Sequence, residues 1–255
     1  MNEIENKVEE NKSEVKKNLI DVDLSTSSDI KENIKSFFFH PLTISLLIIV
    51  IVAGIISYFI MGSQLPQKSF VEAAKGQLDN PKVVIETYED FVCPVCQAFN
   101  ATYDELIKKY EGKSVKFVFM NYPFLSTNST YAAEASMYAN DRGKFWEYKD
   151  KLFEEQKNSY DNGGKEDGAF ITKDKLVQYA DEIGLSGADL RRSLDGREYK
   201  SSVEQQKKSG DDKSVDKKGT PSIFINGNEF VLDSKNKVYR DVDSLSKVID
   251  AELSK

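Results

Sequence analysis

The chain has few of the residues on which most hydrolases and metalloenzymes depend. Its 255 residues include one histidine, His40, and two cysteines, Cys93 and Cys96. A Ser-His-Asp or Cys-His site needs a histidine base, and His40 lies at the edge of an apolar run, outside the soluble part of the chain. A histidine-ligated zinc enzyme is excluded on the same ground. We therefore expect neither a hydrolase of these types nor a bound metal.

Excess basic charge is also absent. The chain has 35 Lys and Arg against 42 Asp and Glu, a net charge of -7. Nucleic-acid binding needs a concentrated cationic surface that releases phosphate counterions, and neither the part before the apolar run nor the part after it is basic. Because 40% of the residues are hydrophobic, a packed core is expected, and nucleic acid is excluded as a partner.

One long stretch, Ser36 to Gln67, carries no charged residue. Within it, Leu42–Met61 is almost unbroken apolar sequence, long enough as a helix at about 1.5 Å per residue to cross the roughly 30 Å core of a bilayer. A buried core helix is the alternative, and the lack of charge argues against it. A cleaved signal peptide is disfavoured because a long polar segment precedes the run. We predict a transmembrane signal anchor at 37–62 after a disordered cytoplasmic tail at 1–36.

The flanking charges do not orient this anchor. Lys31 and Lys35 precede it, and Lys68 and Lys75 follow it, so the positive-inside rule favours neither direction. The orientation must come from the chemistry of the C-terminal part.

Alternating strand and helix patterns follow the anchor. Residues 63–80 are expected to form a linker with one amphipathic turn or short helix, and the folded domain to begin at 81. Strands at Lys82–Glu89 and Val115–Met120 flank a helix at Pro94–Tyr110, which predicts a parallel βαβ unit. A helical insertion is expected at about 125–210, and Asn226-Gly227 predicts a tight hairpin with a type I′ turn before a C-terminal helix. The expected helices of the insertion are Thr130–Asn140, Lys144–Lys157, Lys173–Ile183, Ala188–Leu194 and Arg197–Lys208, with a loop at Asn158–Gly168.

The two cysteines form Cys93-Pro94-Val95-Cys96, where a strand ends and a helix begins. Pro94 suits the first helical turn, in which its missing N–H would have no partner. Cys93 then occupies the N-cap, where free N–H groups and the helix dipole favour a thiolate, the nucleophile of disulfide exchange. Cys96, one turn later, can close the short ring or resolve a mixed disulfide.

Other roles for the pair are less well supported. A zinc or iron–sulfur site needs about four ligands, and the chain has no further cysteine. Covalent haem attachment needs a histidine after Cys96, where the chain has Gln97. An inert structural disulfide stays open as an alternative, although so small a loop would constrain the unfolded chain little.

A second signal lies far away in the sequence. Gly219-Thr220-Pro221 directly precedes an expected strand at Ser222–Ile225. A proline at a strand start is tolerated as an ordinary edge feature. A cis Thr220–Pro221 bond is the more specific interpretation, because cis peptides are essentially confined to proline.

Together these motifs resemble the thioredoxin superfamily, specifically DsbA-like thiol–disulfide oxidoreductases with an inserted helical domain. The resemblance covers roughly Lys82–Leu253. It implies an α/β thioredoxin fold and no cofactor beyond the redox-active Cys93–Cys96 disulfide. The motifs that carry it are Asp90-Phe-Val-Cys-Pro-Val-Cys, Asn121-Tyr-Pro-Phe, Ala132-Ala-Glu-Ala, Gly143-Lys-Phe-Trp-Glu, Lys151-Leu-Phe and Gly219-Thr-Pro-Ser-Ile-Phe-Ile-Asn-Gly.

The resemblance also implies roles for individual residues. Cys93 would be the attacking or substrate-linked sulfur, Cys96 its partner, and Pro221 a cis-proline facing them. The Thr220 backbone would pair with a substrate segment as an added strand, and Pro94 and Val95 join it as candidate substrate-binding residues.

The sequence departs from the family pattern in two places. Many relatives carry a buried acid six residues before the first cysteine, where this chain has Thr87. The adjacent Glu86 is therefore a candidate proton relay to Cys96, with a water or no dedicated group as alternatives. Strongly oxidising members have histidine between the cysteines, whereas this chain has Val95, which leaves the direction of electron flow open.

These features predict a membrane-anchored oxidoreductase that donates disulfides to exported, cysteine-containing proteins. The resemblance implies a membrane thiol oxidase as the recharging partner. The alternatives are an extracytoplasmic reductase or isomerase and a tethered, non-enzymatic binding or chaperone module. Because disulfides persist in oxidising compartments, the C-terminal domain is expected outside the cytoplasm of a single-pass protein.

Overall fold

The computed structural model describes residues 41–62, 67–68, 72–165, 168–230 and 241–255. The predicted disordered tail at 1–36 lies outside these residues. The chain divides into two compact units, Met1–Gly62 and Ser63–Lys255.

In the first unit, Pro41–Gly62 forms one helix, α3, within the segment predicted as an anchor. Across the parts of the chain that the structure describes, no helix has the length and apolarity needed to cross a membrane. The membrane anchor at 37–62 stays a prediction.

The second unit is built on a five-stranded mixed sheet with strand order β1-β3-β2-β4-β5. The central strands β2 and β3 are parallel and joined by helix α4, which confirms the predicted βαβ unit. The other neighbours are antiparallel. The elements of this core are β1 (Ala73–Gly76), β2 (Val83–Glu89), α4 (Pro94–Lys109), β3 (Val115–Asn121), β4 (Ser222–Ile225), β5 (Asn228–Phe230) and α11 (Val242–Leu253).

Strand β1 corrects the prediction of a short helix within 63–80. Ala73 to Gly76 pair antiparallel with β3, and Ala73 is fully buried. The backbone N–H and C=O groups at the edge of β3 need hydrogen-bond partners, which a neighbouring strand can supply and a helical turn cannot. The long-range pairing of β1 with β3 therefore outweighs the local helical spacing. The folded domain therefore begins before residue 81.

The two faces of the sheet have different cover. On one face, Val83, Ile85 and Phe117 pack with α4 and α11 side chains such as Leu106 and Ile249. On the other face lies a smaller cluster of six buried side chains: Tyr88, Val118, Met120, Tyr122, Val215 and Phe224. Since successive strand residues point to opposite faces, the odd-numbered residues of β2 face α4 and the even-numbered ones face away from it.

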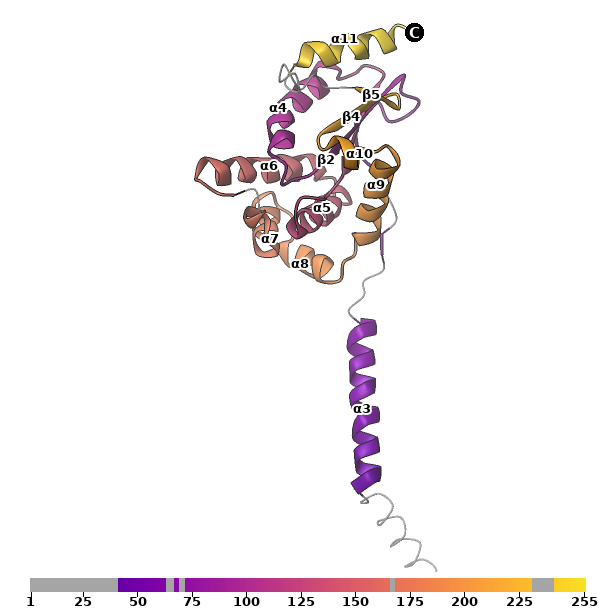
Figure 1. The fold of residues 1–255 in the computed structure, drawn as a ribbon, viewed down its shortest axis with the longest axis vertical. Coiled ribbons are helices and arrows are strands. Elements are labelled where there is room, and N and C mark those ends of the chain that lie inside the picture. The colour runs from indigo at the N-terminus through magenta and orange to yellow at the C-terminus, as the bar shows by residue number, and fades with distance from the viewer. Residues whose placement is uncertain (1–40, 63–66, 69–71, 166–167, 231–240) are drawn as a thin grey trace, which may run out of the picture. The chain divides into compact units, whose positions relative to one another are not determined.

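The helical insertion lies between β3 and β4 in the chain and supplies most of a third core cluster. Figure 1 shows α5, α7 and α8 at one end of this unit and α11 at the other. Two differences from the prediction are that α6 extends into the expected loop and that a short helix, α10, precedes β4. The helices are α5 (Thr127–Asn140), α6 (Phe145–Asp161), the 3-10 turn η1 (Ala169–Ile171), α7 (Lys173–Glu182), α8 (Gly187–Asp195), α9 (Lys200–Asp212) and α10 (Val215–Lys218).

The β4–β5 hairpin has the predicted turn. Asn226 and Gly227 both have positive φ, 49° and 77°, as a type I′ turn requires. The Asn226 side chain also accepts from Val84 N–H at 2.9 Å, which ties the turn to β2.

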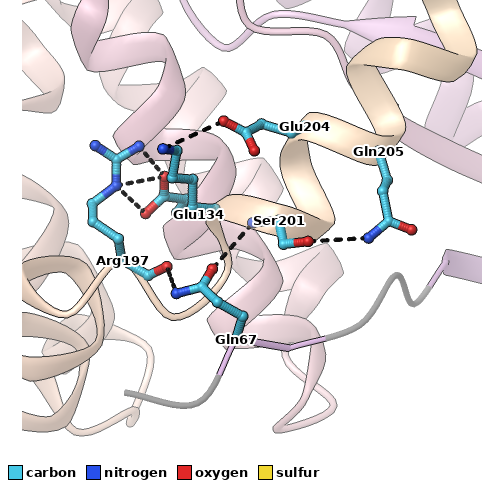
Figure 2. Close-up of polar contacts among 7 residues, drawn as sticks. Gln67, Glu134, Arg197, Ser201, Glu204 and Gln205 are labelled. Carbon is cyan, nitrogen blue, oxygen red and sulfur yellow. Dashed lines mark hydrogen bonds and ion pairs between the residues drawn. The ribbon is translucent and has the colours of Figure 1, made fainter. Parts of the chain in front are cut away.

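A buried ion pair holds the insertion together (Figure 2). The Arg197 guanidinium donates to both oxygens of Glu134, which is 1% exposed. The Gln67 amide donates to the Arg197 carbonyl at 2.8 Å and accepts from Ser201 N–H at 3.3 Å. The segment before β1 is thereby fastened to the turn between α8 and α9.

Candidate redox site

The site begins where β2 gives way to α4. Cys93 is the N-cap of α4 and Pro94 is its first residue, as the sequence predicts. The Cys93 N–H donates to the Asp90 carbonyl at 3.0 Å, which closes the turn before the helix. The first N–H groups of α4 have no helical acceptors, so they point towards the Cys93 sulfur.

This position stabilises a Cys93 thiolate. A hydrogen bond from the Cys96 thiol is the main cause that lowers the Cys93 pKa to about 7. Burial opposes the shift, whereas hydrogen bonds from Thr220 and from the backbone N–H groups of Val95 and Cys96 support it. Cys93 is therefore the stronger nucleophile and the better leaving group of the pair.

Cys96 has the opposite character. Its side chain is fully buried, and burial raises its pKa well above the ordinary value. The neighbouring Cys93 and Glu89 raise it further, since negative charge disfavours a second thiolate. Cys96 therefore stays protonated until a nearby group accepts its proton.

The Thr220–Pro221 bond is cis and lies against Cys93. The Cys93 sulfur donates to the Thr220 carbonyl oxygen at 3.3 Å. Within the described residues, the buried Thr220 Oγ1 has no partner of normal geometry, so its hydroxyl can turn towards a Cys93 thiolate. The structure thus brings together the two motifs that the sequence separates by more than a hundred residues.

Glu86, the residue considered as a proton relay, points away from the cysteines. It pairs across the strands with Phe224 and Val118, which both belong to the cluster on the face away from α4. Its carboxylate forms an ion pair with Lys213 on that face. The physical reason is the pleat of β2, which gives even-numbered residues the face that α4 does not cover.

Glu89 is the acid that the sequence analysis did not assign to this role. It is 2% exposed, and its distance in sequence from Thr87 places both on the α4 face of β2. Burial raises its pKa to about 8, against the opposing influence of Lys149 and of Thr87. Charges on Glu89 and on both cysteines influence one another, so this carboxyl belongs to the redox site. The sequence contains a signal for this: side chains alternate between the two faces along a strand, so residue 89 lies on the same face as residue 87.

Several polar atoms around Glu89 lack a regular partner. Among the described residues, Thr87 Oγ1, Glu89 Oε1 and Tyr103 OH are buried without a hydrogen bond of normal geometry. The Thr87 hydroxyl is still close enough to oppose the rise that burial causes in the pKa values of Glu89 and Tyr103. Thr87, Glu89 and Tyr103 therefore form a buried polar cluster beside the cysteines.

Asp90 fixes the active-site turn to the next loop. Its buried carboxylate accepts from Val92 N–H at 2.8 Å, from Phe124 N–H at 2.9 Å and from Leu125 N–H at 3.0 Å. Phe124 and Leu125 expose large apolar side chains, as does Val95 between the cysteines. Asp90 thereby ties the loop that carries Phe124 and Leu125 to the turn before Cys93.

Comparison with known proteins agrees with this geometry. The family model described as Thioredoxin matches residues 72–251, which is most of the chain. The chain belongs to the thioredoxin family. Together with the Cys93–Cys96 site, the relatives make it a DsbA-like thiol–disulfide oxidoreductase.

Two curated relatives and one solved structure illustrate how far the likeness extends. The chain is 29% identical to the probable disulfide bond formation protein D of Bacillus cereus, over 81% of this chain and 93% of that protein. It is 30% identical to disulfide bond formation protein D of Bacillus subtilis, over 70% and 75% of the two chains. The crystal structure of oxidised BdbD from Bacillus subtilis has the same fold, with a TM-score of 0.60 and 24% identity over 75% of this oxidoreductase and 100% of that chain.

Proposed function

We propose that this oxidoreductase donates disulfides to exported proteins from a membrane tether. The observation that carries the proposal is the asymmetry of the pair: Cys93 has a pKa of about 7, and the buried Cys96 has a raised pKa. Stabilising the Cys93 thiolate stabilises the reduced enzyme, which makes its disulfide a ready donor to thiols of ordinary pKa.

Donation takes two exchange steps. A substrate thiolate attacks Cys93 Sγ, the Cys93–Cys96 bond breaks, and Cys96 leaves as a thiolate that takes up a proton. A second substrate thiolate then attacks the substrate sulfur of the mixed disulfide. Cys93 leaves as a thiolate held by Thr220 and the α4 N-terminus, and the substrate keeps the new disulfide.

Glu89 is the proton donor and acceptor for Cys96 in this proposal. Its pKa of about 8 keeps most of it protonated near neutrality, so it can give a proton to the leaving thiolate. The same carboxyl can take the proton back when Cys96 must attack. A pKa close to the working pH suits both directions.

Substrate is expected to pair with the backbone at Thr220 as an added strand, next to Cys93. The exposed Val95, Phe124 and Leu125 offer apolar contacts to an unfolded polypeptide, which exposes such side chains. Sequence-tolerant contacts of this kind fit an enzyme that acts on many cysteine-containing proteins.

The tether rests on the uncharged sequence from Ser36 to Gln67 and on the need for an oxidising compartment. A membrane thiol oxidase would recharge the reduced pair. Protease added to intact spheroplasts should digest the C-terminal domain, and digestion only after lysis would contradict this location.

A reductase or isomerase is the second candidate, because a Cys93 pKa of about 7 is closer to that of thioredoxin than to the far lower value of the strongest oxidants. The test is to mix oxidised enzyme with a reduced, unfolded protein and count the thiols lost. Transfer of one disulfide per enzyme supports the proposal. No transfer, together with a reduction potential near that of thioredoxin, would favour the reductase.

A further inference from the structure

Lys149 is a fully buried lysine contributed by the helical insertion. It lies on α6, and its side chain is 0% exposed. Its ammonium donates to Asn100 Oδ1 at 2.5 Å and to Asp104 Oδ1 at 2.9 Å, and it lies 2.9 Å from Asp150 Oδ1. Lysine is almost never fully buried unless it is paired, as Lys149 is here.

The Lys149 ammonium is surrounded by oxygen atoms and aromatic rings. Three oxygen acceptors surround the ammonium, and the rings of Tyr103 and Trp146 lie 5.7 Å and 5.5 Å from it. Asp104 and Asp150 are about half exposed, so either could form an ion pair with a lysine at the surface, without that lysine being buried. Desolvating an ammonium is costly, so the burial of Lys149 depends on these oxygen partners and rings.

On its inner side, Lys149 shares a water-excluded region with Glu89. Tyr103, whose ring faces the ammonium, belongs to the same buried polar cluster as Thr87 and Glu89. No ion pair joins Lys149 to Glu89 among those found in the described residues, so the two act on each other through space, where low polarity strengthens the interaction. Among the described residues, the other charged or titratable groups that act on Glu89 or are acted on by it are Cys93, Cys96, Tyr103 and Asp104. Negative charge on Cys93 and Asp104 raises the pKa of Glu89, and the Glu89 carboxylate raises the pKa values of Cys96 and Tyr103.

We propose that Lys149 is a positioning residue of the redox site, whose positive charge makes the ionised form of Glu89 easier to reach, so that Glu89 can take the proton of Cys96. The inference deepens the proposed function and rests on it. It also assigns the helical insertion a part in the chemistry, because Lys149 belongs to α6 and its charge acts on the Glu89 carboxyl.

The two directions of exchange respond differently to this charge. In recharging, the Cys96 thiol passes its proton to the Glu89 carboxylate, and the Cys96 thiolate attacks Cys93 Sγ of a mixed disulfide. The Cys93–partner bond breaks, the partner leaves as a thiolate, and the Cys93–Cys96 bond forms. This step needs ionised Glu89, which Lys149 favours. Donation needs protonated Glu89, which remains available without Lys149.

The test is ring closure of enzyme carrying glutathione on Cys93, followed as glutathione release across pH. Lys149→Met keeps the apolar stem between Tyr103 and Trp146 and removes the charge. We expect the midpoint of ring closure to rise by about one pH unit, which is about tenfold slower closure at pH 7. Lys149→Arg, which keeps the charge, should restore most of the rate.

Lys151→Met is the matched control. Lys151 lies on the same helix but pairs with Glu155 and Glu182. Its replacement by methionine therefore removes an equal charge without changing the surroundings of Glu89. Its midpoint should equal that of the wild type.

A double variant separates a charge effect from a packing effect. In a Glu89→Gln background, Lys149→Met should leave the pH midpoint unchanged; a shift of the same size there, or none in the single variant, would overturn the proposal. If Lys149→Met fails to fold, Lys149→Gln takes its place in both backgrounds. Failure of the proposed function is seen separately, since it would abolish disulfide transfer to a reduced protein without altering glutathione release.

Discussion

The Cys93 sulfur lies 3.3 Å from the carbonyl oxygen of Thr220, a residue that follows it by 127 positions. This contact places the reactive sulfur at the edge of the strand that begins after Pro221. A substrate segment that pairs with the Thr220 backbone is therefore brought directly to the sulfur it must attack.

The first prediction concerns the two thiols. In the reduced enzyme, Cys93 should be alkylated with a midpoint near pH 7, because its thiolate is stabilised by Cys96, Thr220 and the α4 N-terminus. Cys96 should react far more slowly over the neutral range, since burial keeps it protonated. Mass spectrometry after brief alkylation at several pH values measures both, and equal rates would contradict the assigned roles.

Glu89 should make the reduced enzyme less stable as pH rises. Its folded-state pKa of about 8 exceeds its ordinary 4.5, so the stability is full below pH 4.5 and falls as pH approaches 8. Glu89→Gln should then be more stable than the wild type at pH 7 by on the order of 3 kcal/mol, with a smaller gain at pH 5.

Urea unfolding at the two pH values measures this difference. Glu86→Gln, on the opposite face of β2, is the matched control and should show no such gain. A Glu89→Gln variant that loses stability at pH 7 would show that the carboxylate is better solvated than its burial indicates.

Asp90→Asn tests how the active-site turn is held. The carboxylate accepts three backbone N–H groups, and an amide with one acceptor oxygen cannot satisfy all three. We expect a loss of about 2–3 kcal/mol in unfolding free energy and slower transfer to protein substrates, because Phe124 and Leu125 lose their fixed place. Unchanged stability would mean that the loop is held by other contacts.

Arg197→Met should strand the buried Glu134 carboxylate. Removing one partner of a buried ion pair costs about 3–5 kcal/mol, and Glu134 is 1% exposed. Arg192→Met is the control, since Arg192 is 70% exposed and its pair with Asp189 contributes little. Chemical denaturation of both variants gives the comparison, and similar midpoints would contradict the role assigned to Arg197.

Local sequence determined much of this protein. Pro94 after Cys93 placed the thiol at a helix N-terminus, and Thr220-Pro221 before a strand indicated the cis bond, because each depends on backbone rules that act within a few residues. Asn226-Gly227 likewise determined the hairpin turn.

Tertiary structure decided which acid lies beside the cysteines and where the sheet ends. Alternation along β2 shows that Glu86 and Glu89 point to opposite faces, but only the packing of α4 decides which face is the redox face. Strand β1 and the burial of Lys149 depend on partners distant in sequence, at the edge of β3 and on α4. Strand pairing and burial depend on contacts between such distant segments, so the local residue pattern does not predict them.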